Sequence, residues 1–186
     1  METNIIVLDN FYNNVDEVRD YALQRNFNIY GNYPGVRTEP EPQEQHGYLK
    51  TFFETILNKK IMYWPIEYNT AYQYTIEDDT TWVHHDDTRW AGVLYLTPDA
   101  PIKSGTSFYR HIDTKISTWT PGEELDYNKS EDANNLDKWE QVSTIANVYN
   151  RLVLYNGFSY HRSLLPGFGK TKEDGRLFQT FFFNTY

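Results

Sequence analysis

Histidine is scarce in this sequence, and two of the five histidines adjoin each other in the run WVHHDD at 82–87. In a strand, residues i and i+2 share a face, so a His-x-Asp pair directs an imidazole and a carboxylate to one point. Two such pairs are available here, His84 with Asp86 and His85 with Asp87, and they would point to opposite faces. The pattern fits a metal site or a solvated acidic turn, and other residues must decide between them.

Two later segments add residues of the required types. His161 follows an apolar run, NRLVLY at 150–155, and Arg176 opens another, RLFQTFFF at 176–183. Two histidines and one aspartate on neighbouring strands fit the facial triad that binds Fe(II) and leaves one side of the metal open. Those open positions can bind a 2-oxoacid and O₂. An arginine can bind the far carboxylate of such an acid through two parallel hydrogen bonds. Zinc fits the same ligands, and would indicate hydrolysis or a structural site.

The composition narrows the functional classes. The 186 residues include 39% hydrophobic and 17% aromatic side chains, which favours an ordered β-rich globule with a sizeable core. The formal net charge is −9, and no basic run could follow a phosphate backbone, which argues against nucleic-acid binding. Because cysteine is absent, any metal must be held by His, Asp or Glu.

No segment resembles a targeting signal or a membrane span. The N-terminal run METNIIVLDNFYNN has no basic region followed by a long apolar stretch. No window approaches the roughly 18 apolar residues that a transmembrane helix needs. We therefore expect a cytoplasmic protein with no membrane contact.

The first 60 residues are expected to support the site from outside. Ile5 to Leu8 reads as a strand, and Asn14 with Glu17 has the spacing of a capping box before a helix at 15–25. The Gly- and Pro-rich stretch 28–45 predicts mostly loop. A second amphipathic helix is predicted from about 47 to 58, because its apolar residues recur at helical spacing.

From residue 61 the sequence breaks into short β-type runs separated by turn residues, which predicts a sandwich or jelly roll. The polar stretch 111–150, with a helix predicted at about 131–146, is interpreted as an insertion over one end of the sandwich. We expect one mainly β (α+β) domain over 1–186, with helical support at 1–60 and a jelly-roll core at 61–186. The predicted strands are 61–64, 68–76, 81–86, 91–97, 105–110, 151–156, 158–164 and 176–184.

The order of these segments resembles the prolyl-4-hydroxylase-like branch of the 2-oxoglutarate- and Fe(II)-dependent oxygenases. The resemblance rests on His-x-Asp, GVLYL at 92–96, GTSFY at 105–109, NRLVLY, His161 and RLFQTFF. The front half is similar to a subgroup of that branch, through DNFY at 9–12, Arg19 with Ala22-Leu23, and YPGVR at 33–37. The matches cover most of the chain, with 111–150 as the main unmatched part.

The resemblance implies a double-stranded β-helix in which His84, Asp86 and His161 bind iron and Arg176 binds the cosubstrate. It also implies a weaker cosubstrate-binding candidate in Tyr74, and strand parity places Thr180 on the face of Arg176.

Two alternatives accompany this assignment. Asp86 keeps the family's distance to the following strand, but the register of His85 with Asp87 remains open. Lys170 and Lys172 lie nearer to the family's usual spacing from His161 than Arg176 does, yet they read as solvated loop residues. His111 is interpreted as a loop or pocket-rim residue, and nothing assigns His46 to the site.

The implied activity is that of a dioxygenase: decarboxylation of 2-oxoglutarate to succinate, coupled through Fe(II) and O₂ to hydroxylation of a substrate C–H bond. The sequence identifies neither the substrate, a small molecule or a protein side chain, nor the oligomeric state. The alternatives are a non-catalytic β-sandwich binding module with a structural or vestigial metal site, and a cupin-like metalloenzyme that does not use 2-oxoglutarate. Neither of these needs a cation at the start of the last strand.

Overall fold

The fold was analysed in a computed structural model, which describes residues 4–164 and 167–186. Two α-helices precede most of the strands: α1 spans Val15–Gln24 and α2 spans His46–Leu57. The strands are β1 (Ile5–Leu8), β2 (Phe27–Ile29), β3 (Val36–Thr38), β4 (Ile61–Tyr63), β5 (Tyr72–Thr75), β6 (Trp90–Tyr95), β7 (Thr106–His111), β8 (Trp139–Ile145), β9 (Leu152–Asn156), β10 (His161–Ser163) and β11 (Arg176–Thr185).

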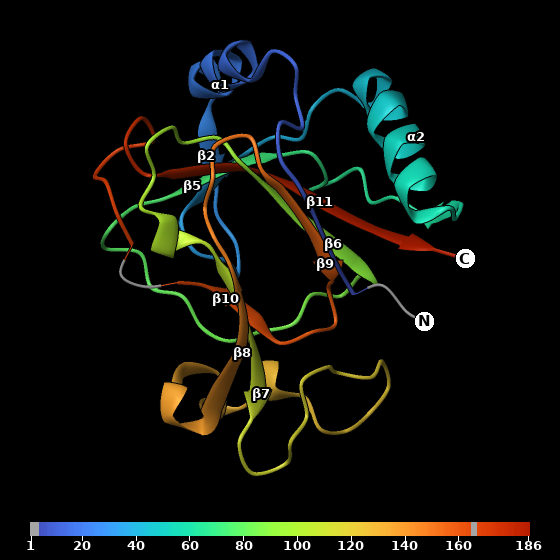
Figure 1. The fold of residues 1–186 in the computed structure, drawn as a ribbon, viewed down its shortest axis with the longest axis vertical. Coiled ribbons are helices and arrows are strands. Elements are labelled where there is room, and N and C mark those ends of the chain that lie inside the picture. The colour runs from blue at the N-terminus through green and yellow to red at the C-terminus, as the bar shows by residue number, and fades with distance from the viewer. Residues whose placement is uncertain (1–3, 165–166) are drawn as a thin grey trace.

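The strands form two antiparallel sheets (Figure 1). The larger sheet has the order β1-β9-β6-β11-β5-β3-β2, with β4 paired to the far part of β11, and the smaller sheet has the order β10-β7-β8. The chain passes from the larger sheet to the smaller one after β6, returns at β9, and crosses once more through β10 before β11, as in a jelly roll. This arrangement confirms the predicted mainly β fold class with N-terminal helices.

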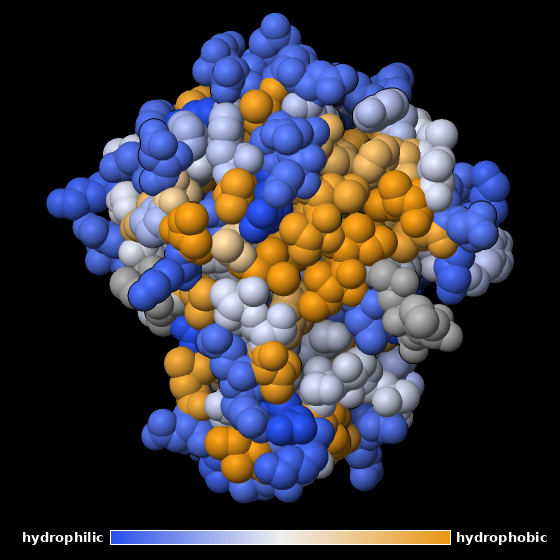
Figure 2. Space-filling model, in the orientation of Figure 1, coloured by the Kyte–Doolittle hydropathy of each residue, from blue (hydrophilic) through white to orange (hydrophobic). Residues whose placement is uncertain are grey.

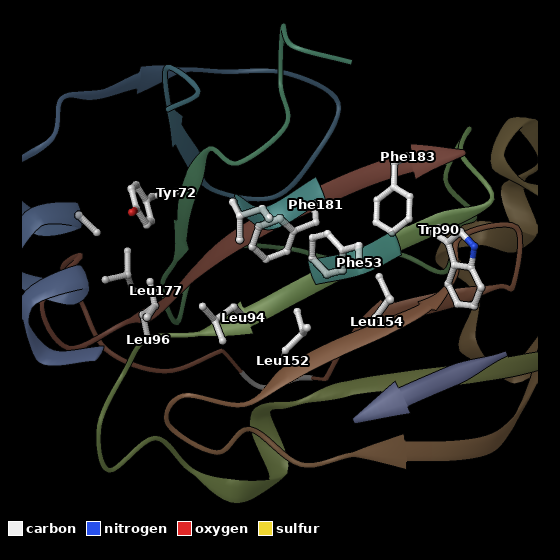
Figure 3. Packing of buried hydrophobic residues seen from close by; sticks show 12 residues of the cluster. Phe53, Tyr72, Trp90, Leu94, Leu96, Leu152, Leu154, Leu177, Phe181 and Phe183 are labelled. Carbon is white, nitrogen blue, oxygen red and sulfur yellow. The ribbon is translucent and has the colours of Figure 1, made fainter. Parts of the chain in front are cut away.

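Both helices pack on the outer face of the larger sheet. Ala22 of α1 and Phe53 of α2 are fully buried against a cluster that includes Leu94, Leu154 and Phe181 from the central strands (Figure 3). The predicted helix positions are confirmed, although the expected cap at Asn14 differs in detail. Its amide donates to the carboxylate of Glu17 at 2.9 Å, and its side chain makes no bond to the helix backbone.

The inner face of the larger sheet packs against the smaller sheet through a second, separate cluster. Val93, Tyr95, Val153 and Phe178 from the larger sheet meet Phe108 from β7. Because side chains alternate along a strand, the central strands bury apolar residues on both faces. This explains the continuous apolar runs in the sequence, which an amphipathic strand would not show.

The helix predicted at about 131–146 is wrong. Short 3₁₀ turns occupy Tyr127–Lys129, Glu131–Asn134 and Leu136–Lys138, and residues 139–145 form β8, which pairs with β7. Side chains of Ser130 and Asn135 accept backbone N–H groups two residues ahead and close each turn locally. The β-branched residues of 139–145 suit an extended strand better than a helix.

Two other expectations need correction. Residues 81–86 form no strand, and their only ladder contact is an isolated bridge between His84 and His161. The stretch 28–45 contains β3, which pairs with β5 and extends the larger sheet. Gly35, which has φ +73°, permits that pairing, because a Cβ atom at this position would lie 1.9 Å from the carbonyl oxygen of Tyr74.

One face of the molecule carries a large apolar area. Figure 2 shows hydrophobic residues gathered beside α2, over the central strands, with hydrophilic residues around them. None of the helices in the described part of the chain combines the length and apolar character that crossing a membrane requires.

The packing of α2 can be tested by truncating Phe53. Phe53→Ala removes a fully buried ring, so we expect the free energy of unfolding to fall by about 3–5 kcal/mol in urea denaturation. Tyr48→Ala on the same helix is the matched control, because Tyr48 is 70% exposed and its loss should change stability by about 0.5 kcal/mol or less. Equal losses from both variants would contradict the placement of α2.

Candidate metal centre and adjoining cavity

His84, Asp86 and His161 converge at one point between the two sheets. One ligand atom from each residue can be chosen so that all three lie within 4.8 Å of one another. The imidazole rings of His84 and His161 have centroids 4.4 Å apart, and Asp86 Oδ2 lies 3.4 Å from His161 Nε2. His84 and Asp86 are partly buried, and His161 is buried.

The segment that carries His84 and Asp86 is fixed without being a strand. His84 and His161 exchange backbone hydrogen bonds of 2.9 and 2.8 Å, and the Asp86 N–H donates to the Gly157 carbonyl at 2.7 Å. From the opposite side, the Asn128 side chain bonds both the N–H and the carbonyl of His85, each at 2.9 Å. The segment 111–150 thus supplies the contacts that a neighbouring strand would otherwise make.

Hydrogen bonds to the rings set the tautomer of both histidines. Nδ1 of His84 lies 3.0 Å from the carbonyl oxygen of Trp82, and Nδ1 of His161 lies 2.8 Å from that of Ser159. A carbonyl oxygen can only accept, so each Nδ1 carries the proton and each Nε2 keeps a lone pair. This is the arrangement in which backbone carbonyls orient metal-binding histidines.

Burial disfavours the charged forms of both His161 and Asp86. Burial lowers the pKa of His161 well below its ordinary value, and His84 adds to this effect. Burial likewise raises the pKa of Asp86, opposed by His84 and Arg37. Within the described residues, Asp86 Oδ2 has no hydrogen-bond partner. Two imidazole nitrogens and an unpartnered carboxylate oxygen are a donor set that fits a first-row divalent metal ion.

The other histidines have structural partners. His85 stacks on Trp119, with ring centroids 4.3 Å apart, and its Nε2 lies 3.0 Å from Asp126 Oδ1. His85 therefore points away from the centre, and the alternative pair with Asp87 is not brought together with His161. Although burial raises the pKa of Asp126, hydrogen bonds from Lys129 and His85 lower it overall.

His111 is not a rim residue, which corrects the expectation. It is buried at the end of β7, stacks on Tyr127 and lies 3.0 Å from Asp132. His46 is buried elsewhere, at the first position of α2, where Nδ1 accepts a hydrogen bond from Trp64.

Arg176 enters the same region from the first position of β11. Its guanidinium is buried beside the Phe178 ring, at 4.7 Å from the centroid. It donates to the hydroxyl groups of Ser163 and Thr106, and Nε has no partner among the described residues. Hydroxyl groups do not neutralise a cation, so Arg176 is a buried charge without an acidic partner in the described chain.

Strand parity separates the two weaker candidates. Thr180 lines the same cavity as Arg176, as expected, although its hydroxyl already bonds the Ala71 carbonyl at 3.2 Å. Tyr74 does not reach this cavity, because it pairs with Leu177 on the opposite face of the sheet and packs on Phe27 in the helix-side cluster.

Two connected hollows surround the three converging residues. A small inner cavity of about 70 Å³ extends to Arg176, and an outer pocket of about 370 Å³ opens beside it. The charged side chains that line the inner cavity are Asp86, Arg37 and Arg176. The residues that line both hollows are Tyr33, Arg37, His84, Asp86 and Phe182.

Two of the lining residues were not identified from the sequence. The Tyr155 hydroxyl lies 3.1 Å from His161 Nε2, and burial raises its pKa well above the ordinary value, so the phenol is neutral. Arg37 lies in the YPGVR motif at 33–37. Its strand was not predicted, so its side chain could not be assigned to a face.

Comparisons with known proteins give the family and the fold. A model described as "Family of unknown function (DUF6445)" matches residues 1–183. The chain belongs to this family. No curated protein matches the sequence.

Solved structures with a similar fold are remote in sequence. HygX from Streptomyces hygroscopicus, with nickel, 2-oxoglutarate and hygromycin B bound, is 12% identical with a TM-score of 0.58, over 96% of this chain and 81% of that one. A prolyl-4-hydroxylase from Pseudomonas putida is 14% identical with a TM-score of 0.54, over 97% and 92%. A prolyl hydroxylase from Trichoplax adhaerens is 13% identical with a TM-score of 0.52, over 97% and 83%. These similarities establish that the chain shares the fold of these proteins, as the sequence resemblance implied.

The converging residues can be tested by metal binding. We expect His84→Gln and His161→Gln each to weaken Ni(II) binding, measured by equilibrium dialysis. The loss should exceed the roughly 10–100-fold that is typical when a residue hydrogen-bonded to a metal ligand is replaced. His111→Gln is the control and should bind Ni(II) as the wild type does, because His111 contacts Tyr127 and Asp132 instead. If His85→Gln abolished binding while His84→Gln retained it, the ligands would be His85 and Asp87.

Proposed function

We propose that this protein is a non-haem Fe(II)- and 2-oxoglutarate-dependent dioxygenase that hydroxylates a substrate at the junction of the two hollows. One observation carries the proposal: a two-histidine, one-aspartate cluster lines the same cavity as a buried arginine that has no acidic partner among the described residues. An Fe(II) ion bound there would supply the oxidation of a C–H bond by O₂, with 2-oxoglutarate converted to succinate and CO₂.

His84, Asp86 and His161 would hold the metal. The Nε2 lone pairs of both histidines and the Asp86 carboxylate would be its three protein ligands, a donor set that leaves further positions of the metal for other ligands. A cation there would also stabilise the ionised form of Asp86, whose pKa burial otherwise raises. The backbone carbonyls of Trp82 and Ser159 would keep both rings oriented.

Arg176 would bind the distal carboxylate of 2-oxoglutarate. Its guanidinium is held between the Tyr95 and Phe178 rings, at 5.3 and 4.7 Å from their centroids, so little rotamer freedom remains to be lost. Ser163 and Thr106 already orient it and offer hydroxyl groups to the same anion. The neutral Tyr155 hydroxyl, beside His161, is a further donor for an oxygen of the cosubstrate.

Anaerobic addition of Fe(II) and 2-oxoglutarate tests this function directly. Chelation of the metal by the 2-oxoacid should give a visible metal-to-ligand charge-transfer band, and exposure to air should then release succinate. A protein that binds Fe(II) but shows no band with 2-oxoglutarate would instead be a binding module or a metalloenzyme of another class.

The role of Arg176 predicts a selective loss. Arg176→Ala should raise the 2-oxoglutarate concentration needed for half of the charge-transfer band by about thirty- to a thousandfold, while Fe(II) affinity stays nearly unchanged. Arg176→Lys should recover only part of this affinity, because an ammonium keeps the charge but loses the two parallel hydrogen bonds.

Lys170→Ala is the matched control, since Lys170 lies 3.8 Å from Glu77 and its side chain is 79% exposed. A loss of about thirty- to a thousandfold from Lys170→Ala, with Arg176→Ala silent, would assign the cosubstrate anchor to the loop instead.

A further inference from the structure

A second arginine, Arg37, lies where the inner cavity meets the outer pocket. It lines both hollows, together with His84 and Asp86. The proposed function gives it no task, because Arg176 already accounts for the cosubstrate carboxylate. Arg37 therefore needs a separate explanation.

The side chain of Arg37 is held in a defined position. Nε donates to Gln73 Oε1 at 2.6 Å, and the guanidinium carbon lies 3.7 Å from the centroid of the Tyr33 ring. Gln73 is held in turn by the Pro34 carbonyl, which accepts a hydrogen bond from its amide at 2.5 Å. These contacts engage one edge and one face of the guanidinium. The other edge, with both terminal nitrogens, remains for a ligand.

No acidic side chain among the described residues forms an ion pair with this guanidinium. In the described part of the chain, Arg37 forms no ion pair, and its side-chain hydrogen bond is the one to Gln73. Asp86 influences it electrostatically, yet burial has the larger effect and lowers the pKa of Arg37. A partly buried guanidinium of this kind is stabilised by an anion in the adjoining space.

A charge count for the centre with metal and 2-oxoglutarate bound indicates which molecule would carry that anion. A divalent metal ion and Arg176 together carry three positive charges, and Asp86 with the two carboxylates of 2-oxoglutarate carries three negative ones. The inner cavity is then balanced, except for Arg37. We propose that Arg37 binds an anionic group, a carboxylate or a phosphate, of the substrate that is oxidised.

This proposal rests on the proposed function and adds a substrate class to it. Anchoring an anion at Arg37 would place the rest of the substrate in the outer pocket, between the aromatic side chains of Tyr33, Tyr68, Trp82 and Phe182. Because Arg37 shares the junction with His84 and Asp86, a carbon close to the anionic group would face the metal. Position 37 would thus determine both specificity and orientation.

The test follows the side-chain NMR signal of Arg37 in protein loaded with Zn(II) and 2-oxoglutarate, so that Arg176 is already occupied. Arg37→Lys identifies the signal by its disappearance. Acetate, inorganic phosphate and the neutral isostere acetamide are then titrated separately at constant ionic strength.

A saturable shift of the Arg37 signal with acetate or phosphate, and none with acetamide, is the expected result. The stronger of the two anions identifies the substrate's anionic group. The Nε signal of Arg110 is the internal control, because Arg110 pairs with Glu140 on the surface and should not respond.

Two results would overturn the proposal. The first is an Arg37 signal that ignores both anions or responds equally to acetamide. The second is a large shift on adding 2-oxoglutarate alone with no later response, which would assign Arg37 to the cosubstrate. A missing charge-transfer band with Fe(II) would instead refute the proposed function and, with it, this inference.

Binding in a variant gives an independent measurement. Arg37→Gln should weaken acetate or phosphate binding to the loaded protein by about tenfold or more, measured by calorimetry. Arg110→Gln removes the same charge outside the pocket and should leave that affinity unchanged. Equal affinities in Arg37→Gln and Arg110→Gln would contradict the role of Arg37.

Discussion

The geometry of the centre depends on one pair of backbone hydrogen bonds, between His84 and His161. This isolated bridge joins a loop to β10 and brings two ring nitrogens and one carboxylate to a common point. A full strand at 81–86 would have been held by a series of backbone hydrogen bonds to its neighbour. Here side-chain contacts from Asn128, with ring contacts between His85 and Trp119, provide the remaining restraint. The segment 111–150 is therefore part of the support of the centre and not merely a cover.

The cavity carries charges that oppose folding. Arg37 and Arg176 are withdrawn from water without acidic partners in the described chain, and Asp86 has an unpartnered oxygen. Such groups cost free energy when no ligand is bound. The apolar clusters on the two faces of the larger sheet can offset that cost, since hydrophobic burial is the dominant favourable term in folding. The apolar residues that stabilise the fold are thus distinct from the charged residues that would bind ligands, although both groups lie on the larger sheet.

Periodicity predicted the elements that bury an apolar face. The helices at α1 and α2 and the strands β6, β9 and β11 follow directly from their spacing and apolar runs. Arg176 could be placed because it opens such a strand. The prediction failed where polar side chains bond their own backbone, as in the 3₁₀ turns before β8, and where a short strand has its pairing decided by tertiary contacts. Tyr74 was assigned from resemblance, although parity with Arg176 places it on the other face.

One feature of β3 limits how this protein can diverge. Arg37, Gln73, Phe178 and Tyr95 form a row across adjacent strands, so all four lie on the inner face of the larger sheet. Gly35 lets the backbone pass close to the Tyr74 carbonyl and fixes the start of that row. Insertions before Tyr33 leave the row intact, whereas losing a single residue between positions 35 and 37 would turn the guanidinium toward the helices. Because Tyr33 and Pro34 hold Arg37 and Gln73, descendants of this sequence can change loop length before Tyr33 but hardly between Tyr33 and Arg37.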